Sequence, residues 1–218
     1  PAGERWALVG PTGSGKTTIV ALLLRFYDPT RGRILIDGVD LREMRQADLR
    51  ARSGFVMQEI HLFAGDLQEN LLLGGGDPSR LESAAQATFA SRVIERLPGG
   101  FHAKVAERGA NLSVGERQLL SFTRALVRDP ELLVLDEATS AVDPATEAIL
   151  ATATHRMLDG RTALVVAHRL STIRDCHRIL VLQQGELVEQ GTHVELTDRR
   201  GVYHSLHALQ SREAVCER

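Results

Sequence analysis

"GPTGSGKT", residues 10–17, decides the fold, because it matches G-x-x-x-x-G-K-[ST] between a strand-type run and a helix-type run. "RWALVG" (5–10) precedes it, and "KTTIVALLLRFYD" (16–28) follows with helical spacing. The glycines let the backbone curl until successive N–H groups point at phosphate oxygens, and the positive helix end reinforces that field. Lys16 supplies a mobile charge for the β- and γ-phosphates, and the Thr17 hydroxyl can ligate Mg²⁺.

This stretch therefore predicts a phosphate-binding loop with ATP as its ligand. A glycine turn that merely contains a lysine would match by chance in about one chain of this length in a hundred. A dinucleotide fingerprint is excluded, because Thr18 stands where its third glycine would be. The predicted nucleotide contacts here are Gly10, Pro11, Thr12, Gly13, Ser14, Gly15, Lys16, Thr17 and Thr18.

Length and composition predict one large domain. The chain has 218 residues, is 43% hydrophobic and 25% charged, and has a formal net charge of −2. The chain has no excess of basic residues that would indicate a nucleic-acid partner. It also has no apolar run long enough to span a membrane. The two cysteines fit no metal or redox spacing, so a reduced, cytosolic setting is expected. No signal peptide is recognisable, and the opening strand pattern indicates a piece of a longer polypeptide.

Strand-type and helix-type segments alternate along the chain. This alternation predicts an α/β fold with a mostly parallel sheet and, in the middle, a helical insertion. "VYHSLHALQSR" near the end reads as a helix. The predicted strands are "GRILIDGVDL" (32–41), "SGFVMQ" (53–58), "ELLVLDE" (131–137), "TALVVAH" (162–168) and a hairpin over "RILVLQQGELVEQG" (178–191).

Polar side chains end three of these predicted strands. Asp136 can hold Mg²⁺ directly or through water, so the predicted metal ligands are Thr17, Gln58 and Asp136. Glu137 can orient or deprotonate an attacking water, and His168 can reach the γ-phosphate. Gln58 can also sense the water. Glu137, His168 and Gln58 are therefore the candidate catalytic residues.

A second loop, "NLSVGERQLLSFTRAL" (111–126), feeds an amphipathic helix. Ser113 can cap this helix, and Glu116 three residues later completes a capping box. A helix N-terminus attracts an anion, but Glu116 brings a negative charge to it. The loop is thus a phosphate site, a weakened phosphate site, or only a well-capped helix.

The order of these motifs resembles the nucleotide-binding domain of ABC transporters. In that family Gln58 corresponds to the Q-loop glutamine, "LSVGE" (112–116) to the signature, "SAVD" (140–143) to the D-loop and His168 to the switch histidine. The resemblance covers nearly the whole chain.

The resemblance implies an α/β fold with a P-loop NTPase (RecA-like) core, an antiparallel β subdomain and an inserted α-helical subdomain. Residues 1–218 would form one ATPase domain, with the core at about 1–60 and 131–218 and the helical subdomain at about 61–130. Transmembrane domains would be absent from the chain.

Two segments are similar to exporter-type members, namely "KVAERG" (104–109) and "LFAGDLQENL" (62–71). The resemblance then implies a motor domain at the cytoplasmic face of the cell membrane. It would bind and hydrolyse ATP with Mg²⁺ and drive the transmembrane domains of an exporter. The segment Phe63–Asn70 would be the coupling surface, for which an exposed apolar face is the structural check.

Two such domains pair head to tail in the family, so Ser113, Gly115, Glu116 and Asp143 would contact a nucleotide held by a second domain. The family's usual signature has glycine and glutamine where this chain has Val114 and Glu116. A branched valine crowds the backbone approach. At ~5 Å and an effective dielectric of ~20, each like charge costs about 3 kcal/mol. A heterodimer with unequal sites is therefore the hypothesis.

Three other functions stay open on the sequence. A soluble ABC-type ATPase of DNA repair or translation would carry long insertions or basic surfaces, which this sequence lacks. A small-molecule kinase with a phosphate-binding loop would leave "LSVGE" and "SAVD" unexplained. A non-catalytic protein with this loop would not need Glu137.

Overall fold

A six-stranded sheet is the centre of the computed structural model, which describes residues 1–57, 59–136, 142–166 and 170–216. The strand order is β10-β9-β1-β8-β7-β4, and of these six strands β10 alone runs antiparallel to its neighbour. The predicted mostly parallel sheet is confirmed. The strands are β1 (Arg5–Val9), β4 (Ser53–Val56), β7 (Leu132–Asp136), β8 (Thr162–Val166), β9 (Arg178–Gln183) and β10 (Glu186–Gly191).

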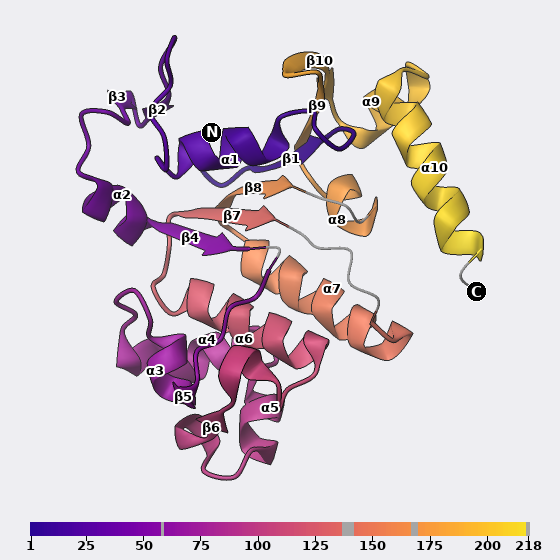
Figure 1. Cartoon of the computed structure of the whole chain (residues 1–218). Coiled ribbons are helices and arrows are strands. Elements are labelled where there is room, and N and C mark those ends of the chain that lie inside the picture. Colours follow the sequence, from indigo (N-terminus) through magenta and orange to yellow (C-terminus); the bar gives the residue numbers. More distant parts are fainter. Residues whose placement is uncertain (58, 137–141, 167–169, 217–218) are drawn as a thin grey trace.

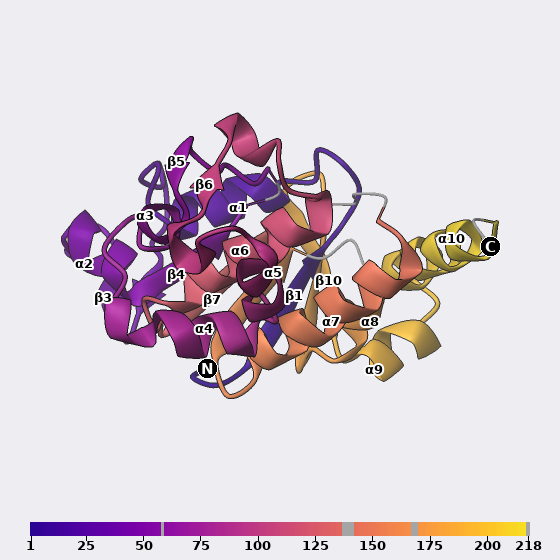
Figure 2. The ribbon, with the colours of Figure 1, turned by 90° about the horizontal axis from the view of Figure 1, so that it is seen from below.

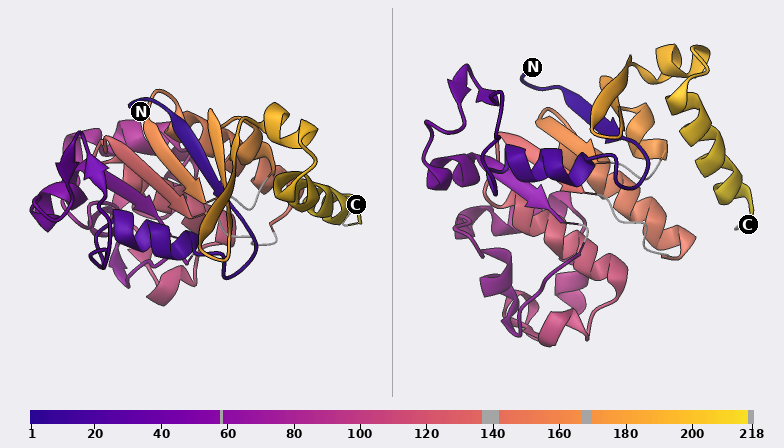
Figure 3. Two further views of the ribbon diagram at one scale, coloured as in Figure 1. Left: turned by 90° about the horizontal axis from the view of Figure 1, so that it is seen from above. Right: turned by 45° about the horizontal axis from the view of Figure 1, so that its top comes forward.

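Helices cover both faces of this sheet (Figure 1). Strand side chains alternate, so Leu133 and Leu135 of β7 belong to one buried cluster and Val134 to the other. On the Val134 face lies α1 (Lys16–Leu23), which is seen across the strands in Figure 3. On the opposite face lie α6 (Val114–Leu126) and α7 (Pro144–Leu158), seen from below in Figure 2.

The segment between β4 and β7 forms a largely helical lobe, as predicted. It joins the sheet through α6, and a buried hydrogen bond of 2.7 Å between Thr88 Oγ1 and Thr123 Oγ1 ties α4 to α6. The lobe holds α3 (Leu67–Leu71), α4 (Leu81–Ala87), α5 (Ser91–Arg96), the strand pair β5 (Gly65–Asp66) and β6 (Lys104–Val105), and 3-10 turns at Pro78–Arg80, Gly100–His102 and Glu107–Gly109.

The single strand predicted for residues 32–41 is wrong. The segment is a hairpin of β2 (Leu35–Ile36) and β3 (Val39–Asp40), followed by α2 (Gln46–Arg52). Asp37 and Gly38 both have positive φ, at 51° and 82°. An Asp-Gly pair of this kind forms the tight turn that reverses a strand.

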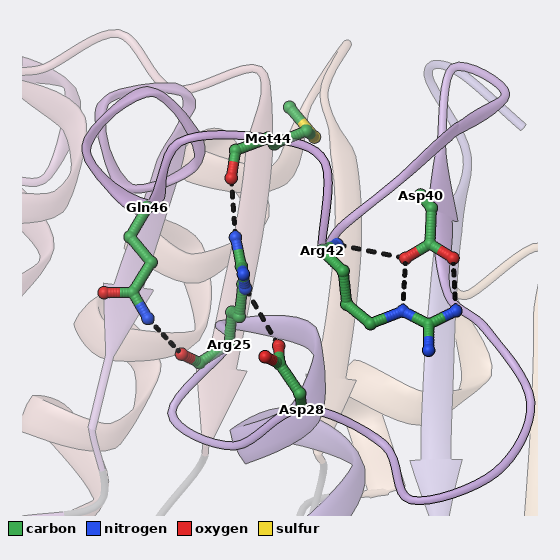
Figure 4. Close-up of polar contacts among 6 residues, drawn as sticks. All are labelled: Arg25, Asp28, Asp40, Arg42, Met44 and Gln46. Atoms are coloured by element: carbon green, nitrogen blue, oxygen red, sulfur yellow. Dashed lines mark hydrogen bonds and ion pairs between the residues drawn. The ribbon is translucent and has the colours of Figure 1, made fainter.

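The helix after the phosphate-binding loop is shorter than the predicted 16–28 and ends at Leu23. Arg25 has a φ of 53°, and the next N–H, of Phe26, bonds the Ala21 carbonyl, which makes a Schellman motif. Glycine usually fills this left-handed position. Figure 4 shows what the arginine provides instead: its guanidinium donates to the Met44 carbonyl (2.5 Å) and to Asp28 (2.9 Å).

The C-terminal part adds α8 (Leu170–Arg174), α9 (His193–Asp198) and α10 (Val202–Cys216). The helix predicted over the last segment and the hairpin of β9 and β10 are both confirmed. α9 packs on β10, and α10 follows it at the side of the molecule (Figure 3). Among the described helices, none combines the length and apolarity needed to cross a bilayer.

Candidate nucleotide site

The phosphate-binding loop joins the carboxyl end of β1 to the start of α1, at the middle of the sheet. Gly15 is the residue before α1, with a φ of 101°, a conformation that glycine adopts without strain. The loop is held by a bond from the Ser14 N–H to the Pro11 carbonyl (3.1 Å). A second bond runs from the Gly185 N–H, in the β9–β10 turn, to the Ser14 carbonyl (3.1 Å). The sequence therefore builds the predicted curled loop and the free helix end behind it.

Lys16 lies over this loop and is only 8% exposed. Its ammonium group donates to the carbonyls of Gly10 (2.7 Å) and Pro11 (3.0 Å). Burial lowers the pKa of Lys16, and the negative charge of Asp136 opposes that shift. A phosphate group would be a second counter-charge for this ammonium group.

The residues of the loop fit a triphosphate in one further respect. Among the described residues, the buried Ser14 hydroxyl has no hydrogen-bond partner. A buried donor without a partner is costly unless a ligand or water satisfies it. The loop thus combines glycine curvature, a helix N-terminus, a buried ammonium group and an unsatisfied hydroxyl.

Two of the three predicted magnesium ligands, Thr17 and Asp136, lie at the side of the sheet where its parallel strands end. Thr17 is exposed at the start of α1, and Asp136 ends β7, which runs parallel to β8 and through it to β1. The described residues contain no cluster of three or more acidic, histidine or cysteine side chains that would cage a metal. One hydroxyl and one carboxylate fit Mg²⁺, which keeps waters and phosphate oxygens as its other ligands.

Three predicted residues cannot be placed. Gln58, Glu137 and His168 lie outside the described residues, as do residues 140 and 141 of the predicted D-loop. Their assignment as catalytic residues, and Gln58 as a metal ligand, stays a prediction.

The second loop caps α6 as the sequence predicts. The Ser113 hydroxyl accepts the Glu116 N–H (3.2 Å), and the Glu116 carboxylate accepts the Ser113 N–H (2.8 Å). The capping box is therefore confirmed. The other carboxylate oxygen of Glu116 pairs with the guanidinium of Arg96, from α5. Burial would raise the pKa of Glu116, but hydrogen bonds from Ser113 and Arg96 hold it below its ordinary value.

Gly115 lies against the start of α7. A Cβ at position 115 would lie 2.3 Å from the Thr146 Cγ2, so no other residue fits without a shift. Asp143 caps α7 through its bond with the Thr146 N–H (3.0 Å), and bonds from Thr146 lower the pKa of Asp143. Gly115 of the predicted signature and Asp143 of the predicted D-loop thus both lie next to Thr146.

The structure does not bring this second loop to the phosphate-binding loop of its own chain. α6 belongs to one face of the sheet and α1 to the other. No hydrogen bond among the described residues connects the two loops. A cavity of about 630 Å³ instead lies between α6 and the sheet, with Val114, Gln118, Leu135 and Asp136 among its lining residues.

Sequence reasoning missed Arg96 and Thr146. Each reaches the signature loop from another helix, 20 or more positions away in the chain. Neither carries a local pattern that could have identified it.

Comparisons with known proteins identify the family of the chain. Residues 1–140 match the protein family described as ABC transporter. The chain is 48% identical, over 98% of its length, to an ATP-dependent lipid A-core flippase of Chromohalobacter salexigens, of which it covers 37%. It is 47% identical, over 94% of its length, to a fatty acid ABC transporter ATP-binding/permease protein of Mycobacterium bovis, of which it covers 33%.

A solved structure is similar over the same extent. It is a bacterial Atm1-family ABC exporter with ATP bound, 45% identical, with a TM-score of 0.87. The match covers 96% of this chain and 37% of that one. The chain therefore spans about a third of the length of these relatives.

Proposed function

Because the chain belongs to the ABC transporter family, we propose that it is the ATP-binding and ATP-hydrolysing motor domain of an exporter. The observation that carries the proposal is the convergence of Lys16 and Asp136 at one sheet edge, where the charge of Asp136 acts on the ammonium group. The motor would act at the cytoplasmic face of the membrane, on transmembrane domains outside these 218 residues. Relatives about three times as long include a lipid flippase and a fatty acid permease, which favours transport over a soluble role.

Each residue has a defined role in this proposal. Lys16 and the N-terminus of α1 hold the β- and γ-phosphates, and Thr17 and Asp136 hold Mg²⁺. The ion supplies positive charge against the phosphate oxygens when it is bound. Glu137 takes the proton of the attacking water, and His168 and Gln58 orient that water and the γ-phosphate.

The direct test is the ATPase activity of the complete transporter with Lys16→Ala or Glu137→Gln. Lys16→Ala is expected to weaken ATP binding about a hundredfold, because a charge-assisted phosphate contact is lost. Glu137→Gln should bind ATP normally and release almost no phosphate. Arg33→Ala, which removes an exposed positive charge outside the predicted motifs, is the control and should leave ATPase activity unchanged. Undiminished phosphate release by Glu137→Gln would contradict the proposal.

The partner is proposed to be a second ABC ATPase domain, bound head to tail and carried by a different chain. The support is the position of Ser113 and Gly115 on the α6 face, away from the phosphate-binding loop of their own chain.

Arg96 offsets the charge of Glu116, so Val114 is left as the cause of a weaker second site. Val114→Gly should then raise turnover in the assembly, whereas Glu116→Gln should change it little. Equal gains from the two variants would contradict this division.

The coupling surface is proposed to be smaller than the predicted Phe63–Asn70. Phe63 is 58% exposed, whereas Leu67, Asn70 and Leu71 are buried, so the exposed apolar face expected over Phe63–Asn70 does not extend into α3. The Asn70 side-chain amide instead accepts the Phe63 N–H and donates to the Phe63 carbonyl, both at 2.8 Å. Met57, which lines the 630 Å³ cavity, is also exposed. We therefore assign the docking of the transmembrane domains to Phe63 and Met57.

A further inference from the structure

We propose that Arg96 of α5 is a positioning residue for the signature loop: its guanidinium neutralises Glu116, so that the start of α6 can accept a phosphate without an opposing charge. The inference rests on the proposed function, because it concerns the half-site that this chain offers to the partner's nucleotide.

Both oxygens of the Glu116 carboxylate are occupied. One accepts the Ser113 N–H at 2.8 Å, and the other pairs with the Arg96 guanidinium. The Glu116 side chain is only 23% exposed. A carboxylate fixed in this way cannot turn into solvent, so its charge stays at the first turn of α6, where the predicted phosphate contacts are. Charge compensation must therefore come from a neighbouring group.

Arg96 is held in place to provide that compensation. It is the last residue of α5, a helix anchored by the buried Val93 and Ile94. The Arg96 Nε donates to the carbonyl of Arg92, one turn earlier (3.3 Å), and Nη2 reaches Glu116. The Arg96 side chain is 67% exposed, and these two bonds direct its guanidinium toward the carboxylate.

The pair could neutralise the charge of Glu116, or it could serve only to hold α5 against α6. The two roles predict different effects of substituting Arg96 and Glu116. If the pair only joined α5 to α6, either Arg96→Ala or Glu116→Gln would loosen the loop. If Arg96 neutralises a charge, Arg96→Ala is harmful only while Glu116 is present. Glutamine at position 116 needs no counter-charge and can still accept the Ser113 N–H, so it should make Arg96 dispensable.

The test uses the complete transporter with four variants: Arg96→Ala, Arg96→Lys, Glu116→Gln and the double variant Arg96→Ala/Glu116→Gln. Arg96→Ala should raise the KM for ATP about tenfold with little change in kcat, because an uncompensated carboxylate repels the triphosphate. High salt should reduce that increase by screening. Arg96→Lys should restore the KM, and the double variant should match Glu116→Gln. A rise in KM that is equal with and without Glu116, or that salt does not change, would overturn the proposal.

A second measurement separates this inference from the proposed function. Urea unfolding of the 218-residue chain and the same alanine and glutamine variants gives the coupling between Arg96 and Glu116 without ATP. If the wild-type transporter fails to turn over ATP, the proposed function is wrong, whereas the unfolding coupling still reports whether Arg96 and Glu116 interact. Additive effects of the two substitutions would then overturn the assignment of Arg96.

Discussion

Gly115 is required by packing, in addition to any contact with a nucleotide. A Cβ there would lie 2.3 Å from the Thr146 Cγ2, well inside van der Waals contact. Gly115→Ala should therefore reduce the free energy of unfolding by about 1–3 kcal/mol, the usual cost of overpacking. Urea unfolding of the chain measures this change.

The control for this prediction is Thr146→Ser, which removes the clashing methyl and keeps the backbone N–H that Asp143 accepts. Gly115→Ala combined with Thr146→Ser should recover most of the lost stability. Additive costs would show that the strain at position 115 has another origin. ATPase activity that stays low after stability recovers would assign Gly115 a direct role at the nucleotide.

At the scale of elements, Arg25 fastens the end of α1 to the segment before α2. Its guanidinium reaches the Met44 carbonyl and Asp28, and the Gln46 amide donates back to the Arg25 carbonyl at 3.3 Å (Figure 4). The backbone of Arg25 is meanwhile in a left-handed conformation that favours glycine.

Arg25→Ala should therefore lower the free energy of unfolding by about 2 kcal/mol, through lost hydrogen bonds that are partly buried. Arg25→Gly should cost less, because it relieves the strained backbone while losing the same bonds. Arg42→Ala is the control, since Arg42 is 46% exposed and pairs with Asp40 of its own hairpin in the same view, and its loss should stay at about 1 kcal/mol. Equal losses for Arg25→Ala and Arg42→Ala in urea would contradict this account.

The docking of α10 depends on an aromatic contact with α9. The Tyr203 hydroxyl lies 2.8 Å from the His193 Nδ1, and the Tyr203 side chain is buried. Burial, then the nearby charges of His207 and Arg174, lower the pKa of His193. Burial raises the pKa of Tyr203 to about 12.

These shifts fix the pH dependence of the contact. A histidine with a lowered pKa contributes stability above its unfolded pKa of about 6.5 and loses it as pH falls. A tyrosine with a raised pKa contributes stability below about 10 and loses it as pH rises towards 12. Hydrogen exchange of the α10 amides should therefore be slowest between about pH 7 and 10, after correction for intrinsic rates. Tyr203→Phe should remove the alkaline change, and its persistence would contradict the assignment.

At the scale of the whole molecule, the sheet separates the helices that follow the phosphate-binding loop and the predicted signature loop. The phosphate-binding loop leads into α1 on one face, and the signature loop leads into α6 on the other. Under the proposed head-to-tail pairing, a working site requires two domains. The ATPase activity of the chain with its partner should rise faster than linearly with protein concentration until the pair is saturated.

Glu137→Gln offers the structural counterpart of that measurement. With ATP and Mg²⁺ the variant should form a stable pair with the partner domain, visible by size-exclusion chromatography with light scattering. Lys16→Ala should prevent pairing through this chain's own loop. Full activity in dilute, strictly monomeric protein would contradict a shared site.

Much of the fold and half of the site could be predicted because they depend on neighbours in sequence. Residues 10–17 specify their own loop, and Ser113 and Glu116 specify their own cap. The hairpin at 32–41 was predicted wrongly as one strand, although Asp37-Gly38 is a turn signal within the alternating pattern. The end of α1 was harder to predict from the sequence, because Arg25 occupies a left-handed position where glycine usually signals the end of a helix.

The sequence by itself determined the phosphate-binding loop, the acid Asp136 at the end of its strand and the capped second helix, because local backbone preferences and side-chain reach suffice for each. Only the tertiary structure decided that Arg96 pairs with Glu116 and that Thr146 packs on Gly115. It also placed the two loops on helices of opposite sheet faces. These contacts join segments that are distant in the chain, and their geometry is set by how the helices pack, which no local pattern encodes.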